Sequence, residues 1–409
     1  MIDVPALISA FVDLFAREEL RQQVVTLAVG SLAIGLLCGY LGRIVWVSIV
    51  KRDQTDINHE KISKDGEELG NLRRNKEELE ERCKKLDDRR REVLAELRPI
   101  RKLKAALDGG EDELWKLYDA NPPEDYPRKM HVRTPRVITV MNLKGGVGKT
   151  TTVANLTAYF CSRGKRVLAI DFDYQGSLTR MMLQAATVTG IGEPIALELL
   201  GSAIEPNQLL KQTVDLSKSV PNARLASCSQ TFDRLESRLM LRWLLGEESD
   251  DVRYRLARVL TDPEVIRNFD IVLIDAPPRM SMGAVNALCA SHAILVPTVL
   301  DVLSAEAVGR FMQRTNRFRE LNMALNFAGV VGTMQSPGGH GKDAIANATK
   351  LAKDGLGKWN ETAHMFDASI RYFVDLAQEA GNDIGYLRHK NVREAYDALG
   401  DEVCRVLQL

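Results

Sequence analysis

The chain has 409 residues, and its 55 Lys and Arg side chains balance 55 Asp and Glu side chains, so the formal net charge is zero. This length allows more than one domain, and the neutral balance gives no overall basicity of the kind that indicates a nucleic-acid-binding protein. The 6 cysteines are scattered, without the paired spacing of a zinc site or a redox motif. A cysteine-based metal site and a disulfide framework are therefore not expected.

The first 50 residues predict two helices. Residues 1–23 carry apolar side chains on one face, which predicts an amphipathic helix. Residues 24–50 are uncharged as far as Gly42, and since a membrane span needs roughly 20 apolar residues, they predict a transmembrane helix. A buried core helix is the alternative. Basic residues follow the uncharged run and place its C-terminal side in the cytoplasm by the positive-inside rule: Arg43, Lys51 and Arg52.

Residues 51–107 are dense in charged side chains, among which apolar residues recur at the heptad interval: Leu72, Leu79, Leu86, Val93, Ile100 and Leu107. A second apolar stripe is interrupted by lysine and arginine, so the segment predicts a charged coiled coil of limited stability. A helical hairpin that bends near Pro99 and a single solvated helix are the alternatives. Residues 108–135 are punctuated by proline and glycine, which predicts a linker.

A glycine-rich stretch then separates a predicted strand from a predicted helix. Residues 136–141 form an apolar run, and residues 150–163 have a helical pattern. The glycines let backbone N–H groups converge on one anion, and the new helix adds its positive N-terminal end. Lys149 is placed to reach the β- and γ-phosphates of a nucleotide, and Thr150 to ligate Mg²⁺. The residues expected to bind the nucleotide are Gly145, Gly146, Val147, Gly148, Lys149, Thr150 and Thr151.

Two later strands end in aspartate. Residues 166–171 end at Asp171, and residues 269–275 end at Asp275. Carboxylates at the C-terminal ends of parallel strands face the nucleotide crevice. Asp275 has the context of a Walker B aspartate and is expected to hold Mg²⁺ through water.

The alternation of strands and helices continues to the end of the chain. Further strands are predicted at 223–227, 293–299 and 327–334, and a loop at 336–342. The predicted fold class is α/β, with a doubly wound, mostly parallel sheet at residues 136–409, preceded by the transmembrane helix and the helical coiled-coil segment.

The stretch Lys-Gly-Gly-Val-Gly-Lys-Thr-Thr-Thr at 144–152 resembles the deviant Walker A motif of the ParA/MinD family of ATPases. The loop that begins at Asp171 resembles the family's Asp-x-Asp-Pro-Gln-Gly element, with Tyr174 in place of proline. The resemblance implies that Lys144 reaches across a homodimer to the partner's nucleotide and that Asp173 orients or deprotonates the attacking water. The catalytic residues it implies are Lys144, Lys149 and Asp173, and the metal-site residues are Thr150, Asp171 and Asp275.

Other parts of the sequence depart from the family pattern. Arg279 stands where the family more often has a small residue, and it is expected to face solvent, with contact to a partner subunit as the alternative. Residues 366–372 occupy the place of the family's Ile-Pro-Arg turn but lack its proline. Contacts of Gln335 and Arg371 with a nucleotide base are therefore not predicted.

These patterns together predict a membrane-anchored ParA/MinD-like, Mg²⁺-dependent ATPase that uses ATP and acts as a switch on a membrane or protein partner through dimerisation and hydrolysis. We expect a homodimer or higher homo-oligomer with an integral single span in the bacterial inner membrane and its ATPase domain in the cytoplasm. The alternatives are a bacterial tyrosine-kinase-like P-loop protein, whose C-terminal tyrosine cluster is missing here, and a membrane scaffold that ATP stabilises without significant turnover. The sequence does not name the protein partner, and it does not favour binding of nonspecific DNA through the basic residues around Arg388.

Overall fold

The computed structural model describes residues 30–31, 33–44, 59–108, 114–124, 126, 135–188, 194–201, 206–299, 302–335, 350, 365–371 and 383–409. These residues divide into two compact units, Met1–Asp108 and Gly109–Leu409. The amphipathic helix predicted at 1–23 and the loop predicted at 336–342 lie outside the described residues.

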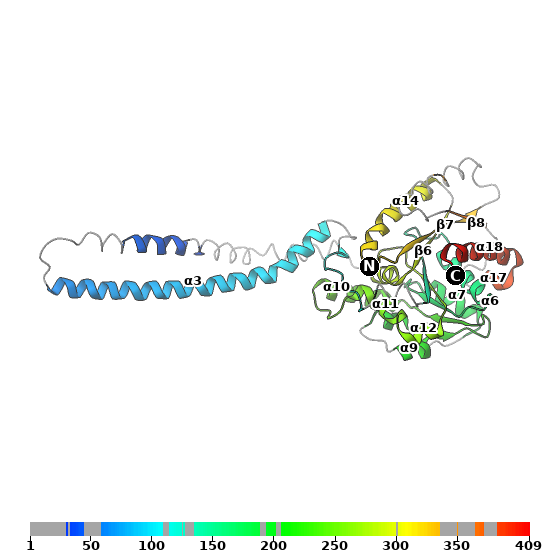
Figure 1. Cartoon of the computed structure of the whole chain (residues 1–409), viewed down its shortest axis with the longest axis horizontal. Coiled ribbons are helices and arrows are strands. Elements are labelled where there is room, and N and C mark those ends of the chain that lie inside the picture. Colours follow the sequence, from blue (N-terminus) through cyan, green and yellow to red (C-terminus); the bar gives the residue numbers. More distant parts are fainter. Residues whose placement is uncertain are drawn as a thin grey trace. The chain divides into compact units, whose positions relative to one another are not determined.

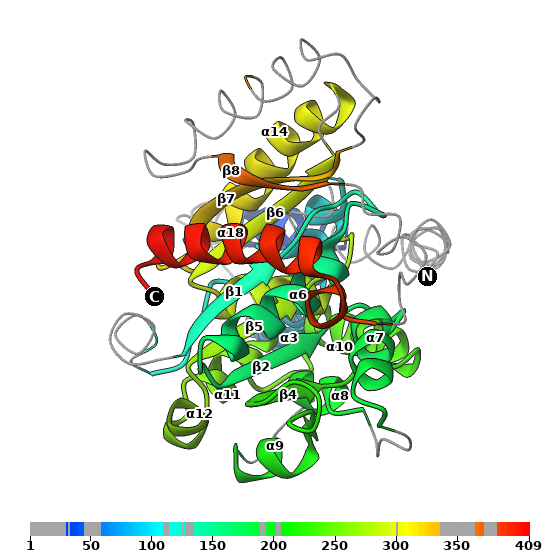
Figure 2. The ribbon, with the colours of Figure 1, turned by 90° about the vertical axis from the view of Figure 1, so that its right-hand side faces the viewer.

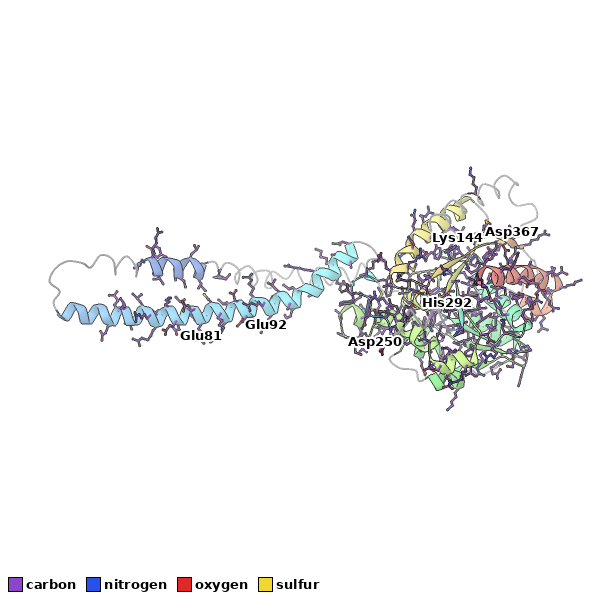
Figure 3. All side chains as sticks on the ribbon, viewed as in Figure 1. Glu81, Glu92, Lys144, Asp250, His292 and Asp367 are labelled. Atoms are coloured by element: carbon purple, nitrogen blue, oxygen red, sulfur yellow. The ribbon has the colours of Figure 1, made fainter. Side chains whose placement is uncertain are left out.

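The first unit contains the long helix α3 (His59–Asp108) (Figure 1). Pro99 lies inside α3, so the chain does not turn back there as a helical hairpin would require. Glu81 and Glu92 project from the helix (Figure 3) and form ion pairs with Lys85 and Arg89 of neighbouring turns. Such exposed pairs between neighbouring turns add slightly to helix stability. The helical character predicted for this region is confirmed, whereas pairing of two such helices in a coiled coil stays a prediction.

The predicted membrane span requires a correction. Of the predicted span, residues 30–31 and 33–44 are described, and they are helical. Within the described part of the chain, no helix combines the length and apolar character needed to cross a bilayer. The predicted single-pass location in the bacterial inner membrane is therefore wrong. Residues 24–29, 32 and 45–50 of the helix predicted at 24–50 lie outside the described residues.

The second unit is built on a mixed sheet (Figure 2), whose described strands follow the order β3-β4-β2-β5-β1-β6-β7-β8. Neighbouring strands are parallel except for the antiparallel pair β3–β4. The predicted doubly wound, mostly parallel sheet is thus confirmed. The strands are β1 (Arg136–Val140), β2 (Val167–Asp171), β3 (Val214–Asp215), β4 (Ala223–Ala226), β5 (Ile271–Asp275), β6 (Ala293–Val299), β7 (Asn326–Gln335) and β8 (Met365–Arg371).

Helices cover the sheet. In Figure 2, α6 and α18 lie in front of the strands, and with α7 they bury a continuous apolar core against this face of the sheet. A second group of helices, α10, α11 and α13, packs together, with α13 in contact with β1. The helices are α6 (Lys149–Ser162), α7 (Ser177–Ala185), α8 (Ala196–Leu200), α9 (Pro206–Gln212), α10 (Thr231–Leu244), α11 (Arg255–Leu260), α12 (Pro263–Asn268), α13 (Met282–Ala290), α14 (Val302–Asn316), α17 (Gly385–Arg388) and α18 (Lys390–Leu407), with 3₁₀ turns η1 (Val252–Tyr254) and η2 (Arg317–Glu320).

The segment formed by residues 114–124 and 126, which we call the strap, packs onto the second unit where the sequence predicts a linker. Its Trp115 is fully buried and stacks on Trp243 of α10 with ring centroids 5.6 Å apart. The fully buried guanidinium of Arg253 donates to the Trp115 carbonyl at 2.6 Å and to the Asp119 carbonyl at 3.0 Å. The same guanidinium pairs with Asp251 at 2.6 Å. A buried charge is costly unless hydrogen bonds satisfy it. The strap therefore stabilises the buried Arg253 by supplying two backbone carbonyls as hydrogen-bond acceptors.

We predict that Trp115→Ala lowers the free energy of unfolding by about 3–5 kcal/mol, since it removes a fully buried aromatic ring and leaves a cavity. Denaturant unfolding of the full chain measures the change. Lys116→Ala is the matched control, because Lys116 forms only a surface ion pair with Glu320 at 3.0 Å, and such a pair contributes about 0–1 kcal/mol. Equal losses in the two variants would show that the strap adds nothing beyond surface contacts.

Candidate nucleotide-binding site

The acidic residues singled out in the sequence meet at one edge of the sheet. In the strand register, Asp275 of β5 lies opposite Val140 at the end of β1 and opposite Asp171 at the end of β2. The glycine-rich loop leaves β1 at this edge, so the loop and both carboxylates lie at the C-terminal ends of neighbouring parallel strands. This is where open α/β sheets bind their ligands.

The loop after β1 has the shape of an anion-binding turn. Gly146 and Gly148 adopt positive φ angles of 71° and 85°, a conformation that residues with a Cβ rarely take. Helix α6 begins directly after them, at Lys149, and its N-terminal end carries a partial positive charge. The Lys149 side chain is 7% exposed and donates to the Lys144 carbonyl at 3.1 Å. Burial lowers the pKa of Lys149, while the charges of Asp275 and Asp173 act in the opposite direction.

Asn142 is a residue of this site that sequence reasoning missed. It is buried, and its Oδ1 accepts the backbone N–H of Lys144 at 2.9 Å while its Nδ2 donates to the Pro297 carbonyl at 2.8 Å. These bonds tie the start of the loop to β6 and fix the backbone from which the exposed Lys144 side chain extends. The available signal was a lone amide side chain at the end of an apolar strand, just before Lys144.

Thr150 and Asp275 form a fitting site for a hard cation. The Thr150 hydroxyl donates to Asp275 Oδ2 at 2.7 Å, whereas the buried Asp275 Oδ1 accepts no hydrogen bond from the described residues. Burial, with the nearby Asp171 charge, raises the pKa of Asp275 well above its usual range. A buried carboxylate oxygen that lacks a partner, beside a hydroxyl, is the oxygen chemistry that Mg²⁺ prefers. The residues present therefore fit a magnesium ion.

Asp171 shapes the loop that follows it. Its Oδ1 accepts the backbone N–H of Asp173 at 3.1 Å, and its Oδ2 accepts the backbone N–H and the hydroxyl of Thr179, both at 2.8 Å. Burial raises the pKa of Asp171 to about 6. With both oxygens committed to hydrogen bonds, Asp171 holds the 173–176 turn against α7, and its predicted role on the magnesium side stays a prediction.

Asp173 sits in a tight turn between β2 and α7. Its Oδ1 accepts the backbone N–H of Gln175 at 3.1 Å, and its carbonyl accepts that of Gly176 at 2.8 Å. Gly176 has a φ of 61°, which closes the turn. Asp173 is half-buried and close enough to Lys149 for its charge to affect the pKa of that lysine.

Two further positions differ from expectation. Arg279 is partly exposed but is held by α10: it forms ion pairs with Asp233 at 2.7 Å and Glu236 at 3.0 Å. The hydrogen bond from Arg279 lowers the pKa of Asp233. The residues placed at a turn before Arg371 instead form β8, which pairs in parallel with β7. The end of β7 contacts the glycine-rich loop, because the Thr333 hydroxyl donates to the Val147 carbonyl at 2.9 Å.

Comparison with known proteins places this site in context. Residues 135–327 match a family model described as an AAA domain. The chromosome-partitioning ATPase Soj of Thermus thermophilus is 33% identical over 205 residues, which are 49% of this chain and 69% of that protein. A Rhizobium rhizogenes protein with the provisional name replication protein A is 35% identical over 196 residues, 46% of each chain. The matched stretch is therefore less than half of that relative.

Among solved structures, cobyrinic acid a,c-diamide synthase from Mycobacterium smegmatis with bound ATP analog and magnesium has a similar fold. The TM-score is 0.50 at 24% identity, and the match covers 67% of this chain and 96% of that chain. At this identity the similarity is one of fold.

We predict that Asp275→Asn weakens Mg²⁺-dependent nucleotide binding by about 10–100-fold, the usual cost of losing a residue that supports a bound metal. Nucleotide affinity would be measured with Mg²⁺ and with a chelator. Asp270→Asn is the control, because Asp270 lies at the opposite end of β5, where it pairs with Arg166 at 2.7 Å. If Asp275→Asn keeps the full difference between the two conditions, Asp275 does not serve the metal.

Proposed function

We propose that this chain binds ATP with Mg²⁺ at the C-terminal edge of the sheet and hydrolyses it. The proposal starts from the family, because this chain belongs to the ParA/MinD-like family of P-loop ATPases. The observation that supports this most strongly is the unpartnered Asp275 Oδ1 beside the Thr150 hydroxyl, at the start of the helix that follows the glycine loop. A nucleotide-bound cation would account for a buried carboxylate oxygen that has no partner among the described residues.

Each residue of the site has a separate task in this proposal. The loop amides and Lys149 hold the β- and γ-phosphates, and Lys149 exchanges its bond to the Lys144 carbonyl for phosphate oxygens. Asp173 orients the attacking water and accepts its proton, and Asp171 holds the turn that carries Asp173. When bound, Mg²⁺ neutralises the charge that develops on the phosphate oxygens.

The proposal includes a homodimer as the active form. The backbone of Lys144 is fixed on both sides, because its N–H bonds Asn142 and its carbonyl accepts Lys149, while its side chain is exposed at the mouth of the loop. A lysine held in this way is suited to reach a nucleotide on a second chain. ATP binding then joins two chains and hydrolysis separates them, which makes the ATP state a switch on a protein partner.

The two rival functions have distinct signatures. A tyrosine-kinase-like protein would need accessible tyrosines as phosphate acceptors, whereas Tyr396 of α18 is buried in the core. A scaffold that ATP only stabilises would show no turnover. Nonspecific DNA binding is not favoured, since Arg388 pairs with Asp383 at 2.7 Å and Arg393 donates to the Tyr386 carbonyl.

We predict that Lys149→Ala abolishes ATP binding, because the loop loses the cation that reaches the β- and γ-phosphates. In contrast, Asp173→Ala keeps binding but lowers hydrolysis by at least about a hundredfold, since proton transfer and water positioning act in the transition state. Nucleotide affinity and phosphate release are measured for both variants. An equal loss of affinity in the two would refute this division of roles.

A mixing experiment tests whether Lys144 acts across the dimer. Lys144→Ala and Asp173→Ala chains should each hydrolyse ATP poorly alone. In a mixed dimer, the site of the Lys144→Ala chain keeps Asp173 and receives Lys144 from its partner, so one of the two sites is complete. Phosphate release by the mixture is therefore predicted to exceed the sum of the separate rates severalfold. A rate equal to that sum would show that Lys144 acts within its own chain.

A further inference from the structure

Two of the positions at which the sequence departs from the family pattern contact each other. Tyr174 replaces the proline of the loop after β2, and Arg279 replaces the small residue after β5. The Arg279 guanidinium lies over the Tyr174 ring at 4.9 Å from its centroid. Contact between an arginine and the face of an aromatic ring is attractive, and more so where water is partly excluded, as it is for the half-buried Tyr174.

Helix α10 anchors the arginine of this pair. Asp233 and Glu236 bind the Arg279 guanidinium from one face of the helix. Glu236 is 4% exposed, and its other oxygen accepts the Ser281 hydroxyl and the Gly283 N–H, each at 2.6 Å. The same carboxylate therefore holds both Arg279 and the first turn of α13, on the segment that directly follows Asp275.

The same helix also contacts the loop after β2. Phe232 of α10 stacks on Phe172, which lies between Asp171 and Asp173, with ring centroids 5.6 Å apart and an interplanar angle of 11°. The loop that carries Asp173 is thus held on both sides of that residue: Phe172 stacks on Phe232, and Tyr174 contacts Arg279. The segment after Asp275 is held by Arg279 and Glu236, so both catalytic loops are fastened to α10.

We propose that Tyr174 and Arg279 form a clasp that positions Asp173 relative to the magnesium side of the site. This inference rests on the proposed ATPase function, and it assigns both residues a positioning role: neither touches the nucleotide. The clasp joins the loop of Asp173 to the segment after Asp275, and so sets the separation between the group that orients water and the group that supports the metal. In a phosphoryl-transfer site, where catalysis depends on placement, a loose clasp lowers turnover without lowering nucleotide affinity.

The test compares turnover with affinity in four variants of the full chain. Tyr174→Leu and Arg279→Gln are each expected to lower kcat for ATP hydrolysis by about tenfold, which is within the cost of displacing a reacting group by a fraction of an ångström. Each is expected to change ATP affinity by less than about twofold. Tyr174→Phe keeps the aromatic face and is expected to retain nearly the wild-type kcat. The double variant is expected to be no slower than the slower single variant, because Arg279→Gln already removes the contact that Tyr174→Leu breaks.

Arg163→Gln provides the matched control. Arg163 lies over the Tyr159 ring at 5.2 Å and pairs with Asp397 and Asp401, so it forms a similar arginine–tyrosine contact away from the site. Its removal is expected to leave kcat unchanged. Unchanged kcat in Tyr174→Leu, a parallel fall of kcat and affinity, or multiplied losses in the double variant would each overturn the clasp. Absence of hydrolysis by the wild-type chain would instead refute the proposed ATPase function.

Should Arg279→Gln fail to fold because it leaves Glu236 buried without a cation, the two Tyr174 variants still decide the matter. Tyr174 forms its contact from a half-buried loop, and its replacement leaves the α10 ion pairs in place. A normal kcat in both Tyr174 variants refutes the clasp, and a loss confined to Tyr174→Leu supports it.

Discussion

The hydrogen bond between Thr150 and the buried Asp275 carboxylate is the contact on which the site depends. It joins the first turn of α6 to the end of β5, and these elements meet because β1, which leads through the glycine loop into α6, pairs in parallel with β5. Burial makes the charged form of Asp275 costly, and a bound cation would offset that cost. The glycine loop, Lys149 and the two carboxylates thus surround a position suited to a ligand of positive charge.

Side chains outside the phosphate-binding motifs connect the loops of the site to the rest of the second unit. Asn142 ties the glycine loop to β6. Glu236 ties the segment after β5 to α10. At its far end, α10 presents Trp243 to the strap, so one helix contacts both catalytic loops and the segment that precedes the sheet. A site assembled from loops acquires fixed geometry in this way, since rigid elements limit how far each loop can move.

The features that could be predicted from the sequence are those that depend on residues close together in the chain. The glycine loop, the apolar strands and the terminal aspartates follow from short-range chemistry, and the structure places them together as expected. The sequence predicts a linker at residues 108–135 because glycines and prolines in that stretch are local signals of a loop, whereas Trp115 is buried by partners more than a hundred residues away, Trp243 and Arg253. The contact of Tyr174 with Arg279 was likewise not predicted, because it joins residues that are far apart in the sequence. In the N-terminal region an uncharged run predicted a span by composition alone, which the described helices do not support.

The most direct test of this account locates the cation. A crystal structure of the chain with a non-hydrolysable ATP analogue and Mn²⁺ in place of Mg²⁺ would reveal the metal by its anomalous scattering. We predict a peak beside the Thr150 hydroxyl, on the side of the unpartnered Asp275 Oδ1, with the nucleotide phosphates in the glycine loop. A peak elsewhere, or a nucleotide bound away from Lys149, would contradict the account.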